Sequence, residues 1–209
     1  MSRNNAGLSR ERIILEALHI IAGRGLGGLS MRRLGDALEV EAMAIYHHFP
    51  LGKEQLFNAI TAYVASPAPQ GTVPIDPADL AGGGGEEGET EDPAAAEAGD
   101  TRPWDVRLTE WAHAYRARLL EFSGALSLLV HRAPQTPSTA ATRALLHRAL
   151  TEAGLSGQDV QRGADAVHSY CVGAVVHQVR HQDEEDAPDE GEARARFDFG
   201  LRALLRGLV

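Results

Sequence analysis

A short segment between residues 30 and 56 gathers the side chains best suited to contact a polyanion. Arg32 lies near its start, the run Tyr46-His47-His48 near its middle and Lys53 near its end. A guanidinium group can form two hydrogen bonds with the edge of a guanine, and Tyr, His and Lys side chains can donate to phosphate oxygens. These residue types in this order predict a surface that binds DNA.

Two short helical patterns that meet at a tight turn would position these side chains. Ser30 is a natural N-cap for a helix with apolar positions 31, 34, 37 and 38, and residues 39–41 form the turn. A second short helix, about 42–48, would enter the major groove with small or polar side chains outward. Val40, Ile45 and Phe49 are expected to pack inward. The residues expected to face outward are Ala42, Met43, Ala44, Tyr46 and His47.

The second helix of this pair offers few groups that read bases directly. It contains no Arg, Lys, Asn or Gln, so the strong bidentate base contacts are missing there. Ala and Met can touch thymine methyl groups, and Glu41 can accept from a cytosine amine. Arg32 is therefore the best base-reading candidate, while the amide ends of the helices that begin after Ser30 and at Lys53 suit phosphate oxygens.

Charge and composition place the binding function in the first part of the chain. The formal net charge is -9, but residues 1–64 carry seven basic and six acidic residues, whereas the remaining residues carry 13 and 23. The acidity therefore lies outside the predicted DNA-binding segment. One cysteine, no secretory signal and no run of 18 apolar residues predict a cytoplasmic protein without a membrane partner.

The rest of the chain also reads as helical, with one interruption. Apolar residues recur at helical spacing over about 10–24, 53–64, 104–122, 126–131, 138–153, 158–182 and 192–208. Residues 65–103 are instead rich in Pro, Gly and acidic residues and predict a flexible acidic linker. The chain is thus expected to be all-α, with a DNA-binding domain at 1–64, the linker, and a ligand-binding and dimerisation domain at 104–209.

These motifs resemble the TetR family of transcriptional regulators. The resemblance rests on the apolar helix at 13–21, the capped helix at 30–38, Tyr46-His47-His48-Phe49, and Lys53-Glu54-Gln55-Leu56. It implies that Arg32 touches a base, that Tyr46, His47, His48 and Lys53 lie near phosphates, and that Ala42, Met43 and Ala44 face bases. It also implies a homodimer, most often a repressor, that reads a palindromic operator. A small-molecule effector would release this homodimer from DNA.

Three positions depart from the family pattern. Glu39 stands in the turn where Gly is usual, Glu41 stands where Ser or Thr usually opens the second helix, and one extra residue, Leu51 or Gly52, precedes Lys53. The two acids motivate an alternative, in which the chain is a DNA-binding-deficient relative that acts as a ligand-binding or protein-interaction module.

The C-terminal part supplies candidates for an effector pocket and for a dimer interface. An apolar pocket with a few polar groups is the expected form of a small-molecule site. The pocket candidates, each of which can also be a core residue, are Trp111, Tyr115, Phe122, His131, His147 and Tyr170. Two amphipathic helices from each of two chains would form a four-helix interface. The interface candidates, which can also pack within one chain, are Val172, Val176, Phe197, Leu201, Leu204, Leu205 and Leu208.

The sequence gives little support for a catalytic or a metal-binding function. No hydrolase, zinc-protease, nucleotide-binding or dinucleotide-binding motif appears, so no catalytic residue and no cofactor is expected. His177 and His181 are four residues apart and can form one side of a metal site, but a solvated helix end accounts for them more simply. Cys171 lies in an apolar stretch, which predicts a buried thiol rather than a redox sensor.

Overall fold

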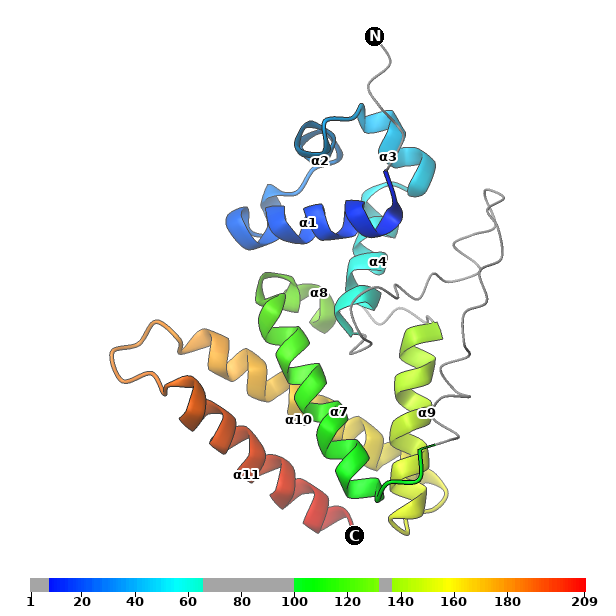
Figure 1. The fold of residues 1–209 in the computed structure, drawn as a ribbon, viewed down its shortest axis with the longest axis vertical. Coiled ribbons are helices and arrows are strands. Elements are labelled where there is room, and N and C mark those ends of the chain that lie inside the picture. Colours follow the sequence, from blue (N-terminus) through cyan, green and yellow to red (C-terminus); the bar gives the residue numbers. More distant parts are fainter. Residues whose placement is uncertain (1–7, 66–99, 132–136) are drawn as a thin grey trace. The chain divides into compact units, whose positions relative to one another are not determined.

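The computed structural model describes residues 8–65, 100–131 and 137–209. Every regular element within these ranges is helical, which confirms the all-α prediction (Figure 1). The chain divides into two compact units, one from Met1–Pro74 and Glu121–Thr136 and one from Ile75–Leu120 and Pro137–Val209. Most of the acidic segment predicted at 65–103 lies outside the described residues.

The first unit is built from short helices around an aliphatic core. Its elements are α1 (Arg10–Arg24), the 3-10 turn η1 (Leu26–Gly28), α2 (Met31–Leu38), α3 (Ala42–His48), α4 (Lys53–Ala65), the 3-10 turn η2 (Ser123–Ala125) and α8 (Leu126–His131). Ser9 caps α1 by accepting from the Arg12 amide at 3.1 Å. Ile13, Leu34 and Ile60 are fully buried, because α1, α2 and α4 each turn an apolar stripe to the same centre.

Residues 121–131 pack with the N-terminal helices, although the sequence pattern groups them with the C-terminal half. A methyl group on Gly124 would lie 3.4 Å from the Cα atom of Ala22 in α1. The ring of Phe122 meets Tyr63 of α4 edge to face, with centroids 5.8 Å apart. Leu126 and Leu128 are buried as well. These apolar side chains find their cover on α1 and α4, so this stretch belongs to the first unit.

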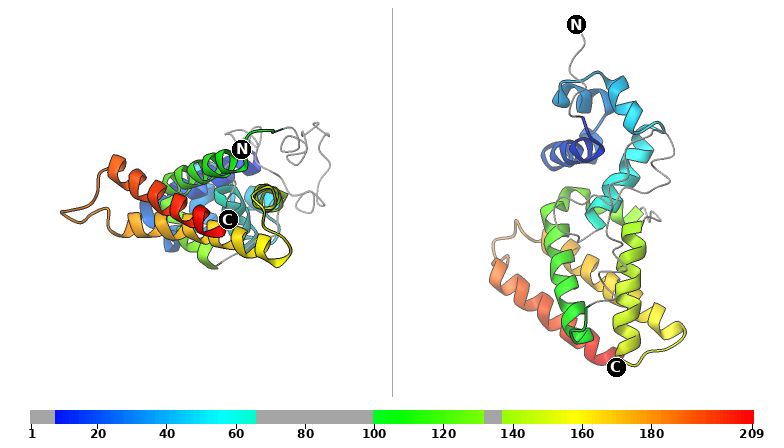
Figure 2. Two further views of the ribbon diagram at one scale, coloured as in Figure 1. Left: turned by 90° about the horizontal axis from the view of Figure 1, so that it is seen from below. Right: turned by 45° about the vertical axis from the view of Figure 1, so that its right-hand side comes forward.

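The second unit consists of longer helices. They are α7 (Trp104–Glu121), α9 (Pro137–Glu152), α10 (Gln158–Arg180) and α11 (Glu190–Leu208). Helices α10 and α11 run side by side in opposite directions, joined by a turn, as both views of Figure 2 show. Asp189 caps α11 by accepting from the Glu192 amide at 2.8 Å. The core residues of this unit include Leu108, Tyr115, Leu119, Leu150, Val167, Cys171, Val175, Phe197 and Leu201.

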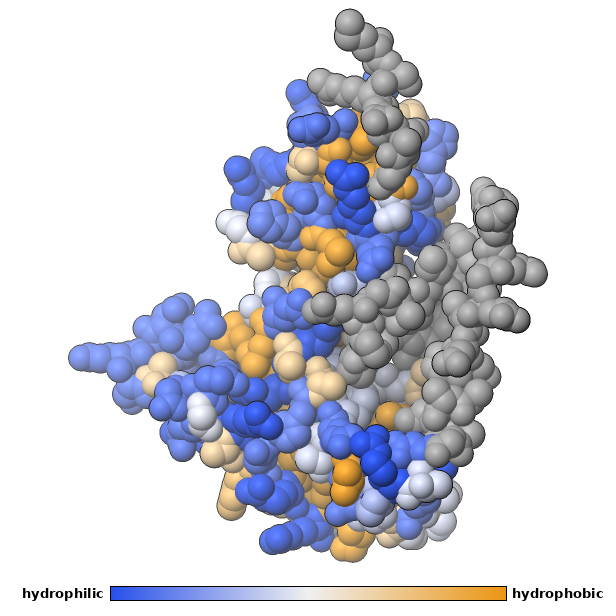
Figure 3. Space-filling view, in the orientation of Figure 1, coloured by the Kyte–Doolittle hydropathy of each residue, from blue (hydrophilic) through white to orange (hydrophobic). Residues whose placement is uncertain are grey.

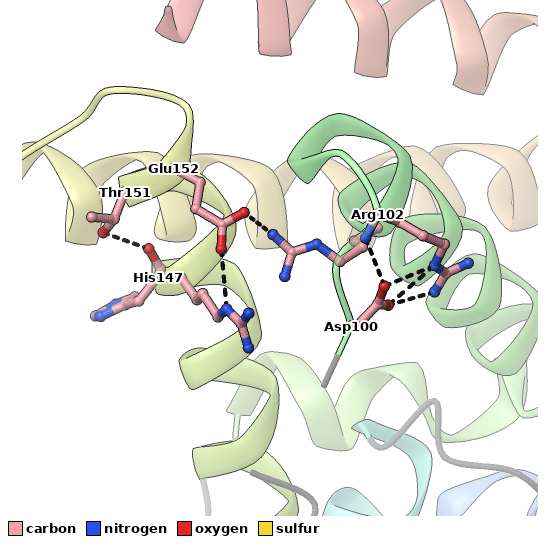
Figure 4. A network of polar contacts seen from close by, with 7 residues as sticks. Asp100, Arg102, His147, Thr151 and Glu152 are labelled. Carbon is pink, nitrogen blue, oxygen red and sulfur yellow. Dashed lines mark hydrogen bonds and ion pairs between the residues drawn. The ribbon is translucent and has the colours of Figure 1, made fainter. Parts of the chain in front are cut away.

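Two buried arginines of α7 tie this helix to its neighbours. The Arg107 side chain is 3% exposed and pairs with Glu152 of α9, which also accepts from Arg148 at 3.0 Å (Figure 4). Arg116 donates to Glu190 at 2.9 Å and to Gln178 at 2.8 Å. Buried guanidinium groups need such partners because an isolated charge is costly to remove from water.

Hydrophilic side chains cover most of the face seen in Figure 3, with smaller apolar patches between them. Cys171 is fully buried, and burial raises the pKa of its thiol to about 12. The confirmed burial leaves little thiolate for redox chemistry. None of the described helices is both long and apolar enough to cross a membrane.

Candidate DNA-binding site

The first helix of the helix-turn-helix pair is held at its amino end by two local contacts. The Ser30 hydroxyl accepts from the Arg33 amide at 3.2 Å, which confirms the predicted N-cap. The guanidinium of Arg33 donates to the Gly28 carbonyl oxygen, so this arginine fastens α2 to the preceding turn. Arg32 is exposed, and so is Arg33. It is therefore accessible for the base contact that the sequence predicts.

The turn between α2 and α3 depends on one close backbone approach and one unusual residue. The Val40 amide donates to the Gly35 carbonyl at 2.9 Å. A methyl group on Gly35 would lie only 2.9 Å from the Val40 carbonyl oxygen, so α2 and the turn are too close for any larger residue. Glu39 adopts the left-handed conformation, with φ 58° and ψ 34°. Glycine is the residue most often found in this left-handed conformation.

Replacing Glu39 with glycine is expected to stabilise the protein. A non-glycine residue in the left-handed region costs about 1 kcal/mol, and the side chain of Glu39 is exposed. We expect Glu39→Gly to raise the free energy of unfolding by about 0.5–1 kcal/mol, measured by urea denaturation. Glu39→Ala, which keeps the strain while removing the charge, is the control. An equal gain from both variants would refute the conformational explanation.

The outer face of α3 is available to a partner. Met43 is 66% and Tyr46 39% exposed, and His47 is exposed beside them. Ala42 and Ala44 are half-buried. The inward packing predicted for Val40, Ile45 and Phe49 is confirmed, since all three are buried. The short helix therefore presents small, apolar and aromatic side chains outward, while its inner face is fastened to the core.

His48 differs from its neighbour His47. It is half-buried at the carboxyl end of α3. Burial, with the adjacent positive charges of Arg10 and His47, lowers the pKa of its imidazole. His48 is therefore neutral at neutral pH and suits a hydrogen bond to phosphate rather than an ion pair. The sequence could not separate the two histidines, because only packing decides which ring is covered.

A tight turn connects α3 to α4 and absorbs the extra residue noted in the sequence. The Gly52 amide donates to the Phe49 carbonyl at 2.8 Å, and Gly52 has φ 68°, a conformation that favours glycine. Leu51 is 79% exposed, and its amide donates to the Gln55 side chain at 3.1 Å. Lys53 begins α4, and its Nζ atom lies 5.0 Å from the centre of the Phe57 ring. The turn therefore holds Leu51 exposed and Gly52 buried, and α4 begins at Lys53 as the sequence predicts.

The residues predicted for the effector pocket divide between the two units. Trp111 and Tyr115 stack in the core of the second unit with centroids 5.1 Å apart, and the Tyr115 hydroxyl contacts His168 at 3.0 Å. Phe122 and His131 belong to the first unit. His147 lies on α9, where its carbonyl accepts from Thr151 (Figure 4). Sequence spacing could not foresee this division, because the chain passes from the second unit to the first after α7.

Tyr170 lines a hollow of about 400 Å³ between α10, α11 and the turn that joins them. Its hydroxyl donates to the Phe197 carbonyl at 2.8 Å. His177 and His181 line the same hollow and stack with centroids 4.3 Å apart. No group of three or more His, Cys, Asp and Glu side chains is placed to hold a metal ion within the described ranges. A further hollow of about 400 Å³ lies between α7 and α11.

The residues predicted for the dimer interface fall into two sets. Phe197, Leu201 and Leu205 are buried within their own chain. Val172, Val176, Leu204 and Leu208 are only half-buried. The outer side of α11 also carries Phe199, which is 72% exposed and did not stand out in the sequence pattern. One apolar stripe of α11 therefore packs inward, whereas a second is available for another molecule.

An exposed recognition helix set on a small helical core, followed by a helical unit with hollows, defines a class of protein: helix-turn-helix DNA-binding regulators. A family model described as "Bacterial regulatory proteins, tetR family" matches residues 13–60. A second model, "Tetracyclin repressor-like, C-terminal domain", matches residues 96–195. The two matches together span most of the chain and include both units.

Relatives in sequence and in structure agree with these models. The tetracycline repressor protein class C of Escherichia coli is 28% identical over 185 residues, which are 88% of this chain and 72% of that protein. An HTH-type transcriptional regulator of Saccharopolyspora erythraea is 25% identical over 233 residues, 100% of this chain and 87% of that protein. The crystal structure of a possible TetR family regulator from Streptomyces coelicolor aligns with a TM-score of 0.69 at 25% identity, covering 96% of this chain and 98% of that one. The chain belongs to the TetR family, and it is a ligand-responsive DNA-binding transcriptional regulator.

Proposed function

We propose that this protein is a cytoplasmic, homodimeric repressor that binds a palindromic operator and leaves it when a small, largely apolar effector binds. The observation that carries the DNA-binding part is the face formed by exposed Arg32, Met43, Tyr46 and His47. Arg32 supplies the base-reading guanidinium, and Met43 supplies an apolar contact for thymine methyl groups. Tyr46, His47 and Lys53 contact phosphates.

A dimer is proposed because one α3 helix makes too few base contacts for specific binding by itself. When two copies of the protein bind two half-sites, the number of contacts doubles. The distance between the half-sites then also contributes to specificity. The half-buried Val172, Val176, Leu204 and Leu208 with exposed Phe199 supply the apolar surface for the second copy. Phe197, Leu201 and Leu205 support this surface from inside the chain.

The effector is proposed to bind in the second unit. Two buried nitrogen atoms of this unit, Nε1 of Trp111 and Nε2 of His147, have no hydrogen-bond partner among the described residues. Buried polar atoms are rarely left unpaired, so each of them offers a hydrogen bond to a bound molecule. Apolar neighbours such as Leu108 and Leu150 favour an effector that is itself mainly apolar.

Helix α7 offers a covalent connection between effector and DNA head. It runs through the second unit, and the chain that follows it forms η2 and α8, which pack on α1 and α4. An effector that binds better to a shifted position of α7 would bias the DNA head through this connection. Release from DNA requires that preference, because a ligand with equal affinity for both states shifts nothing.

Substituting the two proposed cationic contacts tests the DNA-binding assignment. Arg32→Ala is expected to weaken binding by about 1–3 kcal/mol and to relax the preference at one base position. Lys53→Ala is expected to weaken binding to all sequences and to reduce the salt dependence by about one phosphate contact. The measurement is fluorescence anisotropy at several salt concentrations, with a duplex that the unaltered protein has selected from a random pool.

Arg202→Ala serves as the matched control, since this exposed arginine lies on α11 in the second unit. It should leave DNA affinity unchanged. Equal losses from Arg202→Ala and Arg32→Ala would contradict the assignment of the face. A chain that selects no duplex at any salt concentration would instead favour the DNA-binding-deficient alternative.

A further inference from the structure

Arg10 makes a contact, distant in sequence, with the carboxyl end of α3, the proposed recognition helix. It is the first residue of α1 and lies 38 residues before His48, the last residue of α3. Its Nη1 atom donates to the His48 carbonyl oxygen at 2.5 Å. Its Cζ atom lies 4.4 Å from the centre of the Phe49 ring, and Phe49 is fully buried. One guanidinium therefore engages both the last carbonyl of α3 and the residue that follows it.

The carboxyl end of α3 needs such a partner. The last carbonyl groups of any helix lack hydrogen bonds within the helix, and they form the negative end of its dipole. Phe49, at the C-cap position, has φ -132° and ψ 73°, which is not the left-handed conformation that ends many helices. With seven residues, α3 is also too short to be stable without tertiary contacts. A cation on its last carbonyl supplies both a hydrogen bond and favourable charge.

We infer that Arg10 is a positioning residue for DNA recognition, which clamps the carboxyl end of α3 to α1 and thereby sets the orientation of the outer face of α3. This inference rests on the proposed role of α3 in binding DNA. Arg10 acts through His48 and Phe49, so its effect is on the angle at which Met43 meets the bases and Tyr46 meets the phosphates. The planar guanidinium suits this role, because it can stack on a ring while it donates in its own plane.

The surroundings of His48 give the clamp a separate signature. Burial is the main cause of the lowered pKa of His48, and the charges of Arg10 and His47 lower it further. Removing the guanidinium is therefore expected to raise the pKa of His48 partway toward its ordinary value. A lysine at position 10 keeps the charge and so keeps most of this depression, although it cannot reproduce the planar contact.

The experiment compares Arg10→Met, Arg10→Lys and the control Arg12→Met, which removes a cation from the same helical turn of α1. Arg12 is exposed. Discrimination is the ratio of affinities for the duplex selected by the unaltered protein and for a scrambled duplex. Both Arg10 variants are expected to lose about tenfold in discrimination, equivalent to one charged hydrogen bond. Arg12→Met should lower both affinities alike and keep the ratio.

Two measurements on the protein without DNA complete the test. Titration followed by NMR should show a raised pKa for His48 in Arg10→Met only, and amide exchange at Phe49 should become faster in both Arg10 variants. Unchanged discrimination in Arg10→Met, or rescue of discrimination by Arg10→Lys, would overturn the inference. Arg10 would then contribute only its positive charge. If the unaltered protein selects no duplex, the proposed function fails, while amide exchange still decides whether Arg10 clamps α3.

Discussion

Gly35→Ala is expected to disrupt the helix-turn-helix, because the added methyl group would clash with backbone atoms of the turn. The new Cβ atom would lie 2.9 Å from the Val40 carbonyl oxygen and 3.3 Å from the Ala42 nitrogen. Both obstacles are backbone atoms, so no side chain can rotate away, and α2 and α3 must separate. We expect a loss of about 2–3 kcal/mol in the free energy of unfolding, typical of overpacking at a rigid site.

The same change should also weaken DNA binding, because α3 is anchored through this turn. Urea denaturation measures the loss of stability, and fluorescence anisotropy measures the loss of affinity. Gly23→Ala is the matched control, since Gly23 lies within α1 and a methyl group there would meet nothing within 4 Å. Alanine is the better helix former, so this variant should be slightly more stable. A similar stability for the two variants would show that the turn is not tightly constrained.

Glu152→Ala is expected to have the second largest effect, in the other unit. Its carboxylate balances the charge of Arg107, whose side chain is 3% exposed, and no further partner is available for the buried Arg107 Nε atom among the described residues. Removing one member of a buried pair leaves an uncompensated charge. Because Glu152 itself is 41% exposed, water can replace part of its contribution, and we expect a loss of about 2 kcal/mol.

A double variant separates the buried charge from simple loss of packing. Arg107→Met combined with Glu152→Ala removes the buried cation as well and should recover part of the stability. Glu192→Ala is the control, because Glu192 pairs with Arg196 at 2.7 Å in the open, with 54% and 62% of the side chains exposed. Thermal denaturation should show little change for this control. If the double variant is as unstable as Glu152→Ala, the buried charge is not the cause.

Local signals predicted the helices of this protein well. The expected ranges 10–24 and 42–48 coincide with α1 and α3. Ser30 caps α2 as its side-chain chemistry requires. These features depend on apolar periodicity and on hydrogen bonds between residues a few positions apart, which a linear sequence displays directly. The face predicted for DNA contact, with Arg32, Met43 and Tyr46 outward, follows from the same periodicity.

Longer-range relations were not visible in the sequence. The contact of Arg10 with His48 spans 38 residues and has no local pattern. The inward packing of Phe197, Leu201 and Leu205 could not be distinguished from an intermolecular interface, because an apolar stripe does not say which surface covers it. For the same reason, the grouping of residues 121–131 with the first unit escaped prediction.

The sequence by itself determined the all-helical class, the helix-turn-helix and the residues on its outer face, since these are set by side chains close together along the chain. Only the tertiary structure decided that His48 is covered while His47 is exposed, that Arg10 holds the end of α3, and that the predicted pocket residues divide between two units. The physical reason is that burial and charge pairing depend on which elements meet. That choice is made by the whole folded chain.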